Sequence, residues 1–385
     1  MKAAVFYGPK EFRVEKVGIP KMKGLLKHRL FFPCILLAAL LSILLPACSP
    51  SSAAPQPVKW RMATSWTRDN LIYTDGAVAL CQKVAELSDG RLIIEPYPTD
   101  ELASAFGVFD MVSKGEVECG HSWPGYWRDK EPGFLLFSSV PNMMTMQEWV
   151  VWLYGPPQGI ELWRELYAKY NVVPFPGALD GPEFGFFTNK PLRSIDDFKD
   201  LRLRTPGMGA DVLRELGAIP VILPQEEIKG AVQKGEIDGF EFATPAVNWK
   251  LGFDSSIAPY ATLPAWHQPS CMYDVIVNQD AWDKLPDDLK AIFESACKEV
   301  AIVDFVARTE GANPDYLARY EKDGMQIFIL DEKSMQRITE IKDRLCDDLA
   351  ANDAFFARVL KSQREFCTGY RQWEKWGNYQ VYPSK

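Results

Sequence analysis

Residues 112–118 read Val-Ser-Lys-Gly-Glu-Val-Glu, and residues 232–238, 120 positions later, read Val-Gln-Lys-Gly-Glu-Ile-Asp. Each copy follows a helical pattern, turns at Lys-Gly and continues into a short apolar strand. The first strand ends at residues 120–123 and the second at residues 240–242. One helix-to-strand unit in each half of the chain predicts two α/β lobes of related architecture. Because ligands bind outside the carboxyl ends of the strands in open α/β sheets, we expect the residues after each copy to line a cleft between the lobes.

The composition narrows the class of protein. A chain of 385 residues is long enough for two domains, and its net charge of −8 argues against a nucleic-acid partner, which requires a basic face. The sequence contains no Gly-x-Ser-x-Gly, His-Glu-x-x-His or Gly-x-x-x-x-Gly-Lys-Ser pattern of the common catalytic and nucleotide-binding motifs. A binding protein rather than an enzyme is therefore expected.

The region from residue 22 indicates export. A short basic segment precedes an apolar run from Leu30 to Leu45, so residues 22–47 are interpreted as a signal peptide. Cys48 follows the small residue Ala47, and this junction resembles a bacterial lipobox. The resemblance implies that Cys48 is acylated, that residues 48–57 form a linker, and that the protein is held at the membrane by a lipid anchor on the periplasmic side.

Residues 1–21 do not fit this pattern. Residues 1–10, Met-Lys-Ala-Ala-Val-Phe-Tyr-Gly-Pro-Lys, resemble the opening strand of a zinc-type alcohol dehydrogenase. That resemblance leaves a zinc- and NAD-dependent dehydrogenase as an alternative function. The rest of the chain has only three His, no Cys-x-x-Cys and no complete glycine fingerprint. We interpret residues 1–21 as a start-site or gene-fusion artefact, with translation beginning at Met22.

Alternating strand and helix patterns give the domain boundaries. Residues 58–176 and about 265–285 are predicted to form lobe 1, and residues 177–264 and about 286–352 to form lobe 2. Long helices are expected over residues 287–304 and 332–350. Residues 353–385 are predicted to be a C-terminal helix and tail, which either lies across both lobes or pairs with another copy of the chain.

Several motifs, in order, resemble one family. Residues 197–207 read DFKDLRLRTPG and resemble a core motif of the TRAP-transporter solute receptors; residues 216–221, 233–239 and 285–286 extend the match. Residues 241–245 (EFATP) and 264–269 (PAWHQP) resemble segments of the branch that binds 2-oxo acids and hydroxycarboxylates with a metal ion.

The resemblance covers residues 58–380. It implies an α/β, two-lobed periplasmic-binding-protein fold with a ligand cleft between the lobes. It also implies TRAP membrane subunits as partners and, in this branch, a homodimer.

The resemblance also assigns roles to single residues. Arg204 matches the arginine that holds the carboxylate of the solute, a role that suits a planar guanidinium. Glu241 matches a metal-binding carboxylate, and Phe242 replaces a tryptophan whose backbone carbonyl also binds the metal. Glu183 stands where the family has a glutamine ligand. It would add a charge that favours Ca²⁺ over Na⁺, whereas two carboxylates without a metal would repel each other.

The remaining assignments concern the walls of the cleft. The resemblance suggests that Trp266 and either Tyr126 or Trp127 supply apolar walls, although each could belong to the core. His121 and His267 follow strands as single histidines, and structural roles are favoured for both. A metal-free TRAP receptor for another anionic solute remains an alternative. From sequence alone, Arg204→Ala is expected to remove carboxylate binding and leave the fold intact.

Overall fold

The computed structural model describes residues 2–6, 12–16 and 56–377, and the chain divides into two parts, residues 1–53 and 54–385. In the first part, β1 (Lys2–Phe6) pairs antiparallel with β2 (Phe12–Lys16). The predicted signal peptide, Cys48 and the linker up to residue 55 lie outside the described residues. All further elements belong to the second part.

Five strands of the second part form one sheet, in the order β4-β3-β5-β12-β6. β3 runs parallel to β4 and β5, whereas β12 runs antiparallel to β5 and β6. Every residue of β6 and β12 is buried, as expected for strands covered on both faces. The strands are β3 (Val58–Thr64), β4 (Leu92–Tyr97), β5 (Cys119–Ser122), β6 (Val172–Asp180) and β12 (Cys271–Asn278).

Six shorter strands form a second sheet, in the order β13-β11-β7-β10-β8-β9. β8 is parallel to β9 and β10, and β11 is parallel to β13. β7 is antiparallel to both of its neighbours, β10 and β11. The strands are β7 (Phe186–Thr188), β8 (Arg202–Arg204), β9 (Ile219–Val221), β10 (Gly239–Phe240), β11 (Tyr260–Leu263) and β13 (Gln326–Ile329). Helices accompany both sheets, so the predicted two-lobed α/β fold is confirmed.

The repeated sequence motif has the same structure in both lobes. α2 (Val108–Ser113) leads into β5, and α6 (Gln225–Gln233) leads into β10, so the predicted helix-to-strand units are confirmed. Gly115 and Gly235 end the two helices with φ of +72° and +69°. Only glycine adopts this left-handed conformation without a steric cost, which explains the shared Lys-Gly.

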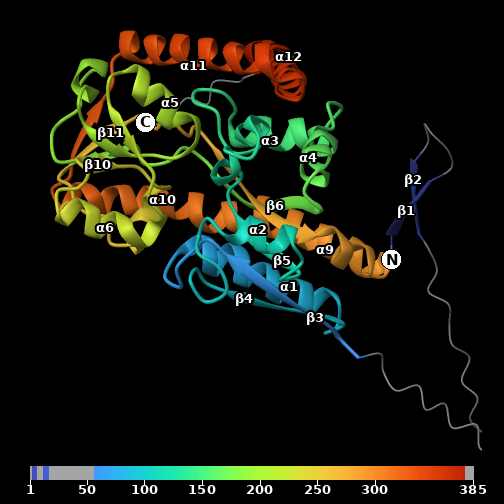
Figure 1. Ribbon diagram of the computed structural model, residues 1–385. Coiled ribbons are helices and arrows are strands. Elements are labelled where there is room, and N and C mark those ends of the chain that lie inside the picture. The colour runs from blue at the N-terminus through green and yellow to red at the C-terminus, as the bar shows by residue number, and fades with distance from the viewer. Residues whose placement is uncertain (1, 7–11, 17–55, 378–385) are drawn as a thin grey trace, which may run out of the picture. The chain divides into compact units, whose positions relative to one another are not determined.

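Two connections and one long helical segment join the lobes. The chain leaves the first sheet through β6 for β7, and it returns from β11 to β12. α9 (Asp287–Lys298) continues through a π-helical stretch, Glu299–Asp304, into α10 (Phe305–Lys322), and Figure 1 shows these orange helices end to end. α9 packs against β6 and α1 (Ala79–Leu87), whereas α10 packs against α7 (Pro245–Lys250) of the second lobe. The sequence prediction had grouped all of residues 286–352 with lobe 2; α9 instead covers the first sheet.

The two C-terminal helices also contact both lobes. α11 (Glu332–Asn352) packs on α5 (Gly207–Glu215), and α12 (Ala354–Gly377) packs on α3 (Met146–Tyr154) and α4 (Gly159–Ala168). Arg371 of α12 donates its Nε hydrogen to Glu148 Oε1 at 2.6 Å. Thr145 and Glu148 form a capping box at the start of α3, so this ion pair attaches α12 to a well-defined helix end.

The remaining helical segments are short. They are α8 (Gln279–Asp283), a π-helical stretch at Ile72–Val78, and 3₁₀ turns at Pro124–Trp127, Pro132–Phe137 and Ile195–Phe198. Within residues 2–6, 12–16 and 56–377, no helix has the length and apolar composition that crossing a membrane requires.

Candidate functional site

A buried cavity lies where the carboxyl ends of strands from both sheets meet. Its volume is about 10 Å³, the space that one water-sized sphere requires. Trp66 and Trp123 follow β3 and β5 of the first sheet, and Arg204 and Phe242 lie at the ends of β8 and β10 of the second. The cavity is lined by Trp66, Trp123, Tyr126, Glu183, Arg204, Pro206, Phe242, Gln268, Cys271 and Tyr273. A cavity therefore lies at the strand ends, where the sequence predicted the site.

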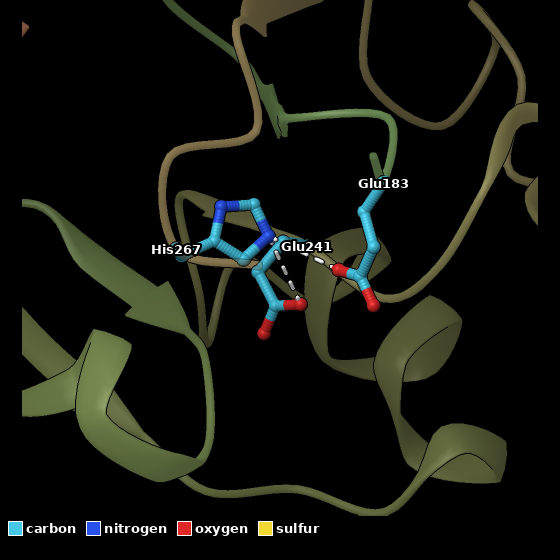
Figure 2. Close-up of side chains that lie close together, drawn as sticks. All are labelled: Glu183, Glu241 and His267. Atoms are coloured by element: carbon cyan, nitrogen blue, oxygen red, sulfur yellow. Dashed lines mark hydrogen bonds and ion pairs between the residues drawn. The ribbon is translucent and has the colours of Figure 1, made fainter. Parts of the chain in front are cut away.

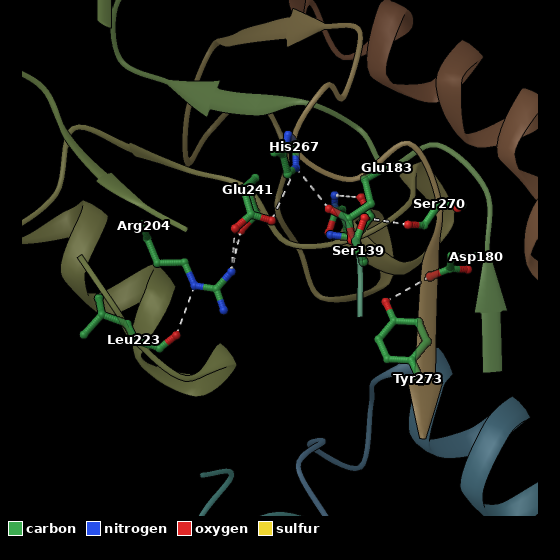
Figure 3. Close-up of polar contacts among 11 residues, drawn as sticks. Ser139, Asp180, Glu183, Arg204, Leu223, Glu241, His267, Ser270 and Tyr273 are labelled. Atoms are coloured by element: carbon green, nitrogen blue, oxygen red, sulfur yellow. Dashed lines mark hydrogen bonds and ion pairs between the residues drawn. The ribbon is translucent and has the colours of Figure 1, made fainter. Parts of the chain in front are cut away.

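Arg204 is buried at the end of β8, with 1% of its surface exposed. Its Nη1 donates to the backbone oxygen of Glu241 at 2.8 Å and to Glu241 Oε1 at 3.1 Å, and its Nε donates to the Leu223 carbonyl at 3.0 Å (Figure 3). The ring of Phe242 lies 5.5 Å from the guanidinium carbon. Nη2 takes part in none of these bonds, so this edge of the guanidinium retains donors for a ligand.

Glu183, Glu241 and His267 form a buried cluster beside Arg204 (Figure 2). His267 Nε2 lies 3.1 Å from Glu183 Oε2 and 3.5 Å from Glu241 Oε2. One ligand atom from each residue lies within 4.8 Å of the other two. In the described part of the chain, Glu183 Oε1 and His267 Nδ1 have no hydrogen-bond partner, and the only polar contact of Glu241 Oε2 is the long one to His267 Nε2. Such atoms are costly in a protein interior unless a ligand or an ion satisfies them.

The electrostatics of the cluster follow from burial and from its charged neighbours. Burial raises the pKa of Glu183, and the negative charge of Glu241 raises it further. Burial would also raise the pKa of Glu241, but the positive charge of Arg204 and a hydrogen bond from His267 hold it below its usual value. Burial opposes the charging of His267, yet its hydrogen bonds to the two carboxylates raise its pKa. The cluster therefore favours a positive charge between the two glutamates.

Asp180 borders the cluster at the end of β6. Its Oδ2 accepts a hydrogen bond from Tyr273 Oη at 3.1 Å, and Figure 3 shows this pair beside Glu183. Burial raises the pKa of Asp180, and the charges of Glu310 and Glu183 raise it further. Asp180 is thus expected to be protonated more readily than an ordinary aspartate, and it adds little negative charge to the site.

The structure brings most of the predicted site residues together. Four of them line the cavity: Arg204, Glu183, Phe242 and Tyr126. Glu241 does not line the cavity but accepts a hydrogen bond from Arg204. Cys48 lies outside the described residues.

Trp127 and Trp266, both predicted as cleft walls, lie elsewhere. Trp127 packs on Phe109, with ring centres 5.1 Å apart. Neighbouring residues of a 3₁₀ turn point in different directions, and here Tyr126 is the one that faces the cavity. Trp266 lies in the core of the second lobe against Phe186 and Phe198. The tryptophans that line the cavity are instead Trp66 and Trp123.

Sequence reasoning missed several members of the site. Trp66 stands in the loop directly after β3, so the rule that ligands bind at the carboxyl ends of strands could have indicated it. Trp123 ends the segment after the first repeat, where the cleft was expected, but it was not named as a wall residue. His267 carried no local signal, because its two carboxylate partners are 84 and 26 positions away in the sequence.

Comparison with known proteins identifies the family of this chain. The model of the DctP family, bacterial extracellular solute-binding protein family 7, matches residues 62–353. A monocarboxylate 2-oxoacid-binding periplasmic protein of Nostoc sp. is 32% identical over 318 residues, which are 83% of this chain and 86% of that protein.

Two solved structures are similar in both fold and sequence. A TRAP solute-binding protein from Pseudoalteromonas atlantica, with bound sodium and pyruvate, superimposes with a TM-score of 0.79 at 32% identity, covering 84% of this chain and 97% of that one. A TRAP solute-binding protein from Bordetella bronchiseptica, a dimer with calcium and picolinate in one site, has a TM-score of 0.80 at 30% identity, covering 84% and 95%.

These matches confirm the family and the two-lobed fold that the sequence motifs implied. The matched range begins at residue 62 and leaves out residues 1–21, the source of the dehydrogenase alternative. The family consists of periplasmic receptors that bind solutes and are not enzymes. The chain belongs to the DctP family of TRAP-transporter solute-binding proteins.

Proposed function

We propose that this receptor captures a small 2-oxo or 2-hydroxy carboxylate, with Arg204 binding the acid group beside a cation held by Glu183 and Glu241. The observation that carries the proposal is Arg204 itself. It is a buried guanidinium on the wall of a cavity between the lobes, and its hydrogen bonds to Glu241 and Leu223 already fix its orientation. A guanidinium oriented in advance loses little entropy when it binds a carboxylate.

A cation is proposed because of the charges around the cavity. When Glu183 and Glu241 are both ionised they carry two negative charges, and Arg204 offsets one of them. A bound carboxylate would add another negative charge in a region of low dielectric constant. Glu183 Oε1, which has no partner in the described region, and Glu241 Oε2, which has only a long contact to His267 Nε2, fit the role of ligands to a positive ion. A divalent cation bound there would balance the charge and accept oxygen atoms of the solute.

The small cavity supports a receptor that encloses its solute. Residues from both lobes line it, and its volume of about 10 Å³ is too small for a carboxylic acid, so the lobes must separate to admit a solute. Free energy for closure comes from contacts that exist only in the closed state. The closed receptor would then deliver the solute to the TRAP membrane subunits.

Calorimetric titration tests the proposed ligand. The purified protein, freed of metal with a chelator, would be titrated with pyruvate, lactate and succinate, with and without Ca²⁺. We expect pyruvate or lactate to bind in the presence of Ca²⁺ and to bind at least tenfold more weakly without it. Arg202→Ala is the matched control, since Arg202 lies on the same strand but pairs with Asp238 away from the cavity. Absence of binding of all three acids under both conditions would contradict the proposal.

A metal-free receptor is the second candidate, and His267 is the observation that favours it. A protonated His267 between Glu183 and Glu241 would itself be the cation that the site requires. In that case the same titration would show equal affinity with and without Ca²⁺.

Two further proposals concern the location and the assembly of the receptor. We infer that Cys48 carries a lipid anchor in the periplasm; Cys48→Ser should move the protein from the membrane fraction to the soluble fraction. We also infer a homodimer through α12, where Trp373 and Trp376 are 67% and 84% exposed. Light scattering of the Trp373→Ser/Trp376→Ser variant should then give the mass of a monomer, and a monomeric wild-type protein would refute the dimer.

A further inference from the structure

His267 is the least expected member of the site. It belongs to the segment between β11 and β12, whereas Glu183 precedes β7 and Glu241 follows β10. Figure 2 shows both carboxylates on one side of the imidazole, with Nε2 directed at one oxygen of each. Three separate segments thus bring a nitrogen and two oxygens to one point inside the protein.

The imidazole is held firmly in this orientation. The ring of Phe186 lies 4.8 Å away, and that of Trp266 lies 5.7 Å away, nearly perpendicular to the imidazole. Only 1% of the His267 surface is exposed. A side chain packed in this way presents Nε2 at a fixed point, which is what an ion-binding site requires.

The distances within the cluster suit neighbouring ligands of one small ion. Metal–ligand bonds of about 2.1 Å at right-angle or tetrahedral positions place the ligand atoms about 3.0–3.4 Å apart. The observed separations from His267 Nε2 are 3.1 Å and 3.5 Å. Glu183 Oε1 has no hydrogen-bond partner in the described region and adds further bonding capacity at the same place.

A nitrogen ligand changes which ion is preferred. Ca²⁺ is bound by six to eight oxygen atoms, and an imidazole does not suit it. Zn²⁺, Co²⁺ and Ni²⁺ bind imidazole together with carboxylates, and their affinities exceed those of Mn²⁺ in the same sites. Three protein ligands also leave a position open for a further ligand, as in zinc sites that bind a water or a substrate.

We propose that His267 is a metal ligand and that Glu183, Glu241 and His267 form a mixed nitrogen–oxygen site that selects a transition-metal dication such as Zn²⁺ over Ca²⁺ and Na⁺. This inference rests on the proposed function and specifies its cation. It distinguishes this chain from its similar solved relatives, which hold sodium or calcium.

Direct metal titration of the chelator-treated protein tests the inference. Co²⁺ reports on its ligands through its visible absorption, and Zn²⁺ and Ca²⁺ would be measured by competition and calorimetry. We expect Co²⁺ to give visible bands that one equivalent of Zn²⁺ removes, and Zn²⁺ to bind at least about 100-fold more tightly than Ca²⁺. His267→Gln should weaken Zn²⁺ binding by at least tenfold while changing Ca²⁺ binding less than threefold. Arg202→Ala should match the wild type, and circular dichroism would verify that each variant is folded.

Each outcome separates this inference from the proposed function. If pyruvate binds with Ca²⁺ and the wild type shows no preference for Zn²⁺, the transition-metal site is refuted and the receptor function stands. If Zn²⁺ and Ca²⁺ binding fall equally in His267→Gln, His267 only packs the site and the inference is refuted. If Zn²⁺ binds as expected but no carboxylate binds, the site stands and the proposed ligand falls. If carboxylates bind and no metal does, an imidazolium at His267 replaces the ion and the inference is refuted.

Discussion

Arg204 and Glu241 form a buried ion pair between neighbouring strands, with Nη1 3.1 Å from Oε1 and with 2% and 0% of the two side chains exposed. This pair gives Arg204 a structural role in addition to its proposed role in binding. The sequence-based expectation that Arg204→Ala leaves the fold intact must therefore be revised. Removing one partner leaves an uncompensated charge in the interior, which costs about 3–5 kcal/mol of stability.

Urea unfolding of Arg204→Ala checks this value. Arg204→Lys should recover part of the stability, because its ammonium group can still pair with Glu241. It should not restore carboxylate binding, because lysine lacks the planar set of donors with which a guanidinium binds both oxygens of a carboxylate. Arg204→Met/Glu241→Gln should be more stable than Arg204→Ala, since both charges are gone. A free energy of unfolding of Arg204→Ala equal to that of the wild type would show that the pair does not matter for folding.

Arg128 links the two lobes next to Pro206, a residue of the cavity wall, because it contacts the neighbouring Gly207. It follows the 3₁₀ turn of the first lobe, and its Nη1 donates to the Gly207 carbonyl at 2.7 Å and lies 2.8 Å from Asp211 Oδ2 on α5. We expect Arg128→Ala to weaken solute binding about fivefold, equivalent to ~1 kcal/mol, because it destabilises the closed state without changing the cavity. Calorimetry with the identified solute measures the change.

Arg214→Ala is the matched control for Arg128. Arg214 pairs with the same Asp211, at 2.9 Å from Oδ1, but both residues belong to α5 and the contact stays within one lobe. Its loss should leave the affinity unchanged. An equal decrease in both variants would mean that Asp211 acts through local charge and that Arg128 does not hold the lobes together.

The sequence predicted those features that local patterns determine. The Lys-Gly turns need only a glycine after a helix, and Gly115 and Gly235 adopt the same conformation in both lobes. Arg204 ends β8 and Glu241 directly follows β10. These strands pair in parallel, so the meeting of the two residues at one sheet edge follows from the motif and the strand order. The rule for strand ends therefore predicted where the cavity and its charged residues lie.

Features that depend on distant segments were not predictable. α10 contains Gly311 and Pro314, which both disfavour helix, yet it forms because its buried face packs on α7. The neighbours Tyr126 and Trp127 point to different surroundings, which no pattern of residue types reveals. His267 is next to two glutamates only because the loop between β11 and β12 returns past β7 and β10.

His121 provides a prediction about pH. Its Nδ1 accepts a hydrogen bond from Trp66 Nε1 at 2.9 Å, and burial lowers its pKa to about 4, although the Gly177 backbone opposes this shift. The unfolded chain, with an ordinary histidine pKa of about 6.5, binds a proton more readily than the folded protein. The stabilising effect of neutral His121 is thus complete above pH 6.5 and is lost as the pH falls toward 4, by up to about 3 kcal/mol.

Urea unfolding at several pH values between 7.5 and 4.5 measures this dependence. His121→Gln is the comparison, because a Gln oxygen can still accept from Trp66 and the side chain does not titrate. The difference between the two proteins should shrink as the pH falls, which isolates His121 from the titrating carboxylates. A difference that stays constant over this range would contradict the assignment of His121 as the titrating group.

The cysteines of the described region provide the last prediction. Burial raises the pKa of Cys346 and of Cys367 to about 11, and it raises the pKa of the other four as well. The six residues are free and buried: Cys81, Cys119, Cys271, Cys297, Cys346 and Cys367. A buried thiol that resists ionisation is a poor nucleophile. In protein that lacks the signal segment and carries Cys48→Ser, a thiol reagent should therefore label none of the six in the native state and all six in denaturant. A reducing agent should leave the melting temperature unchanged; a decrease would reveal a disulfide, and fast labelling of one thiol in the native state would reveal an exposed site.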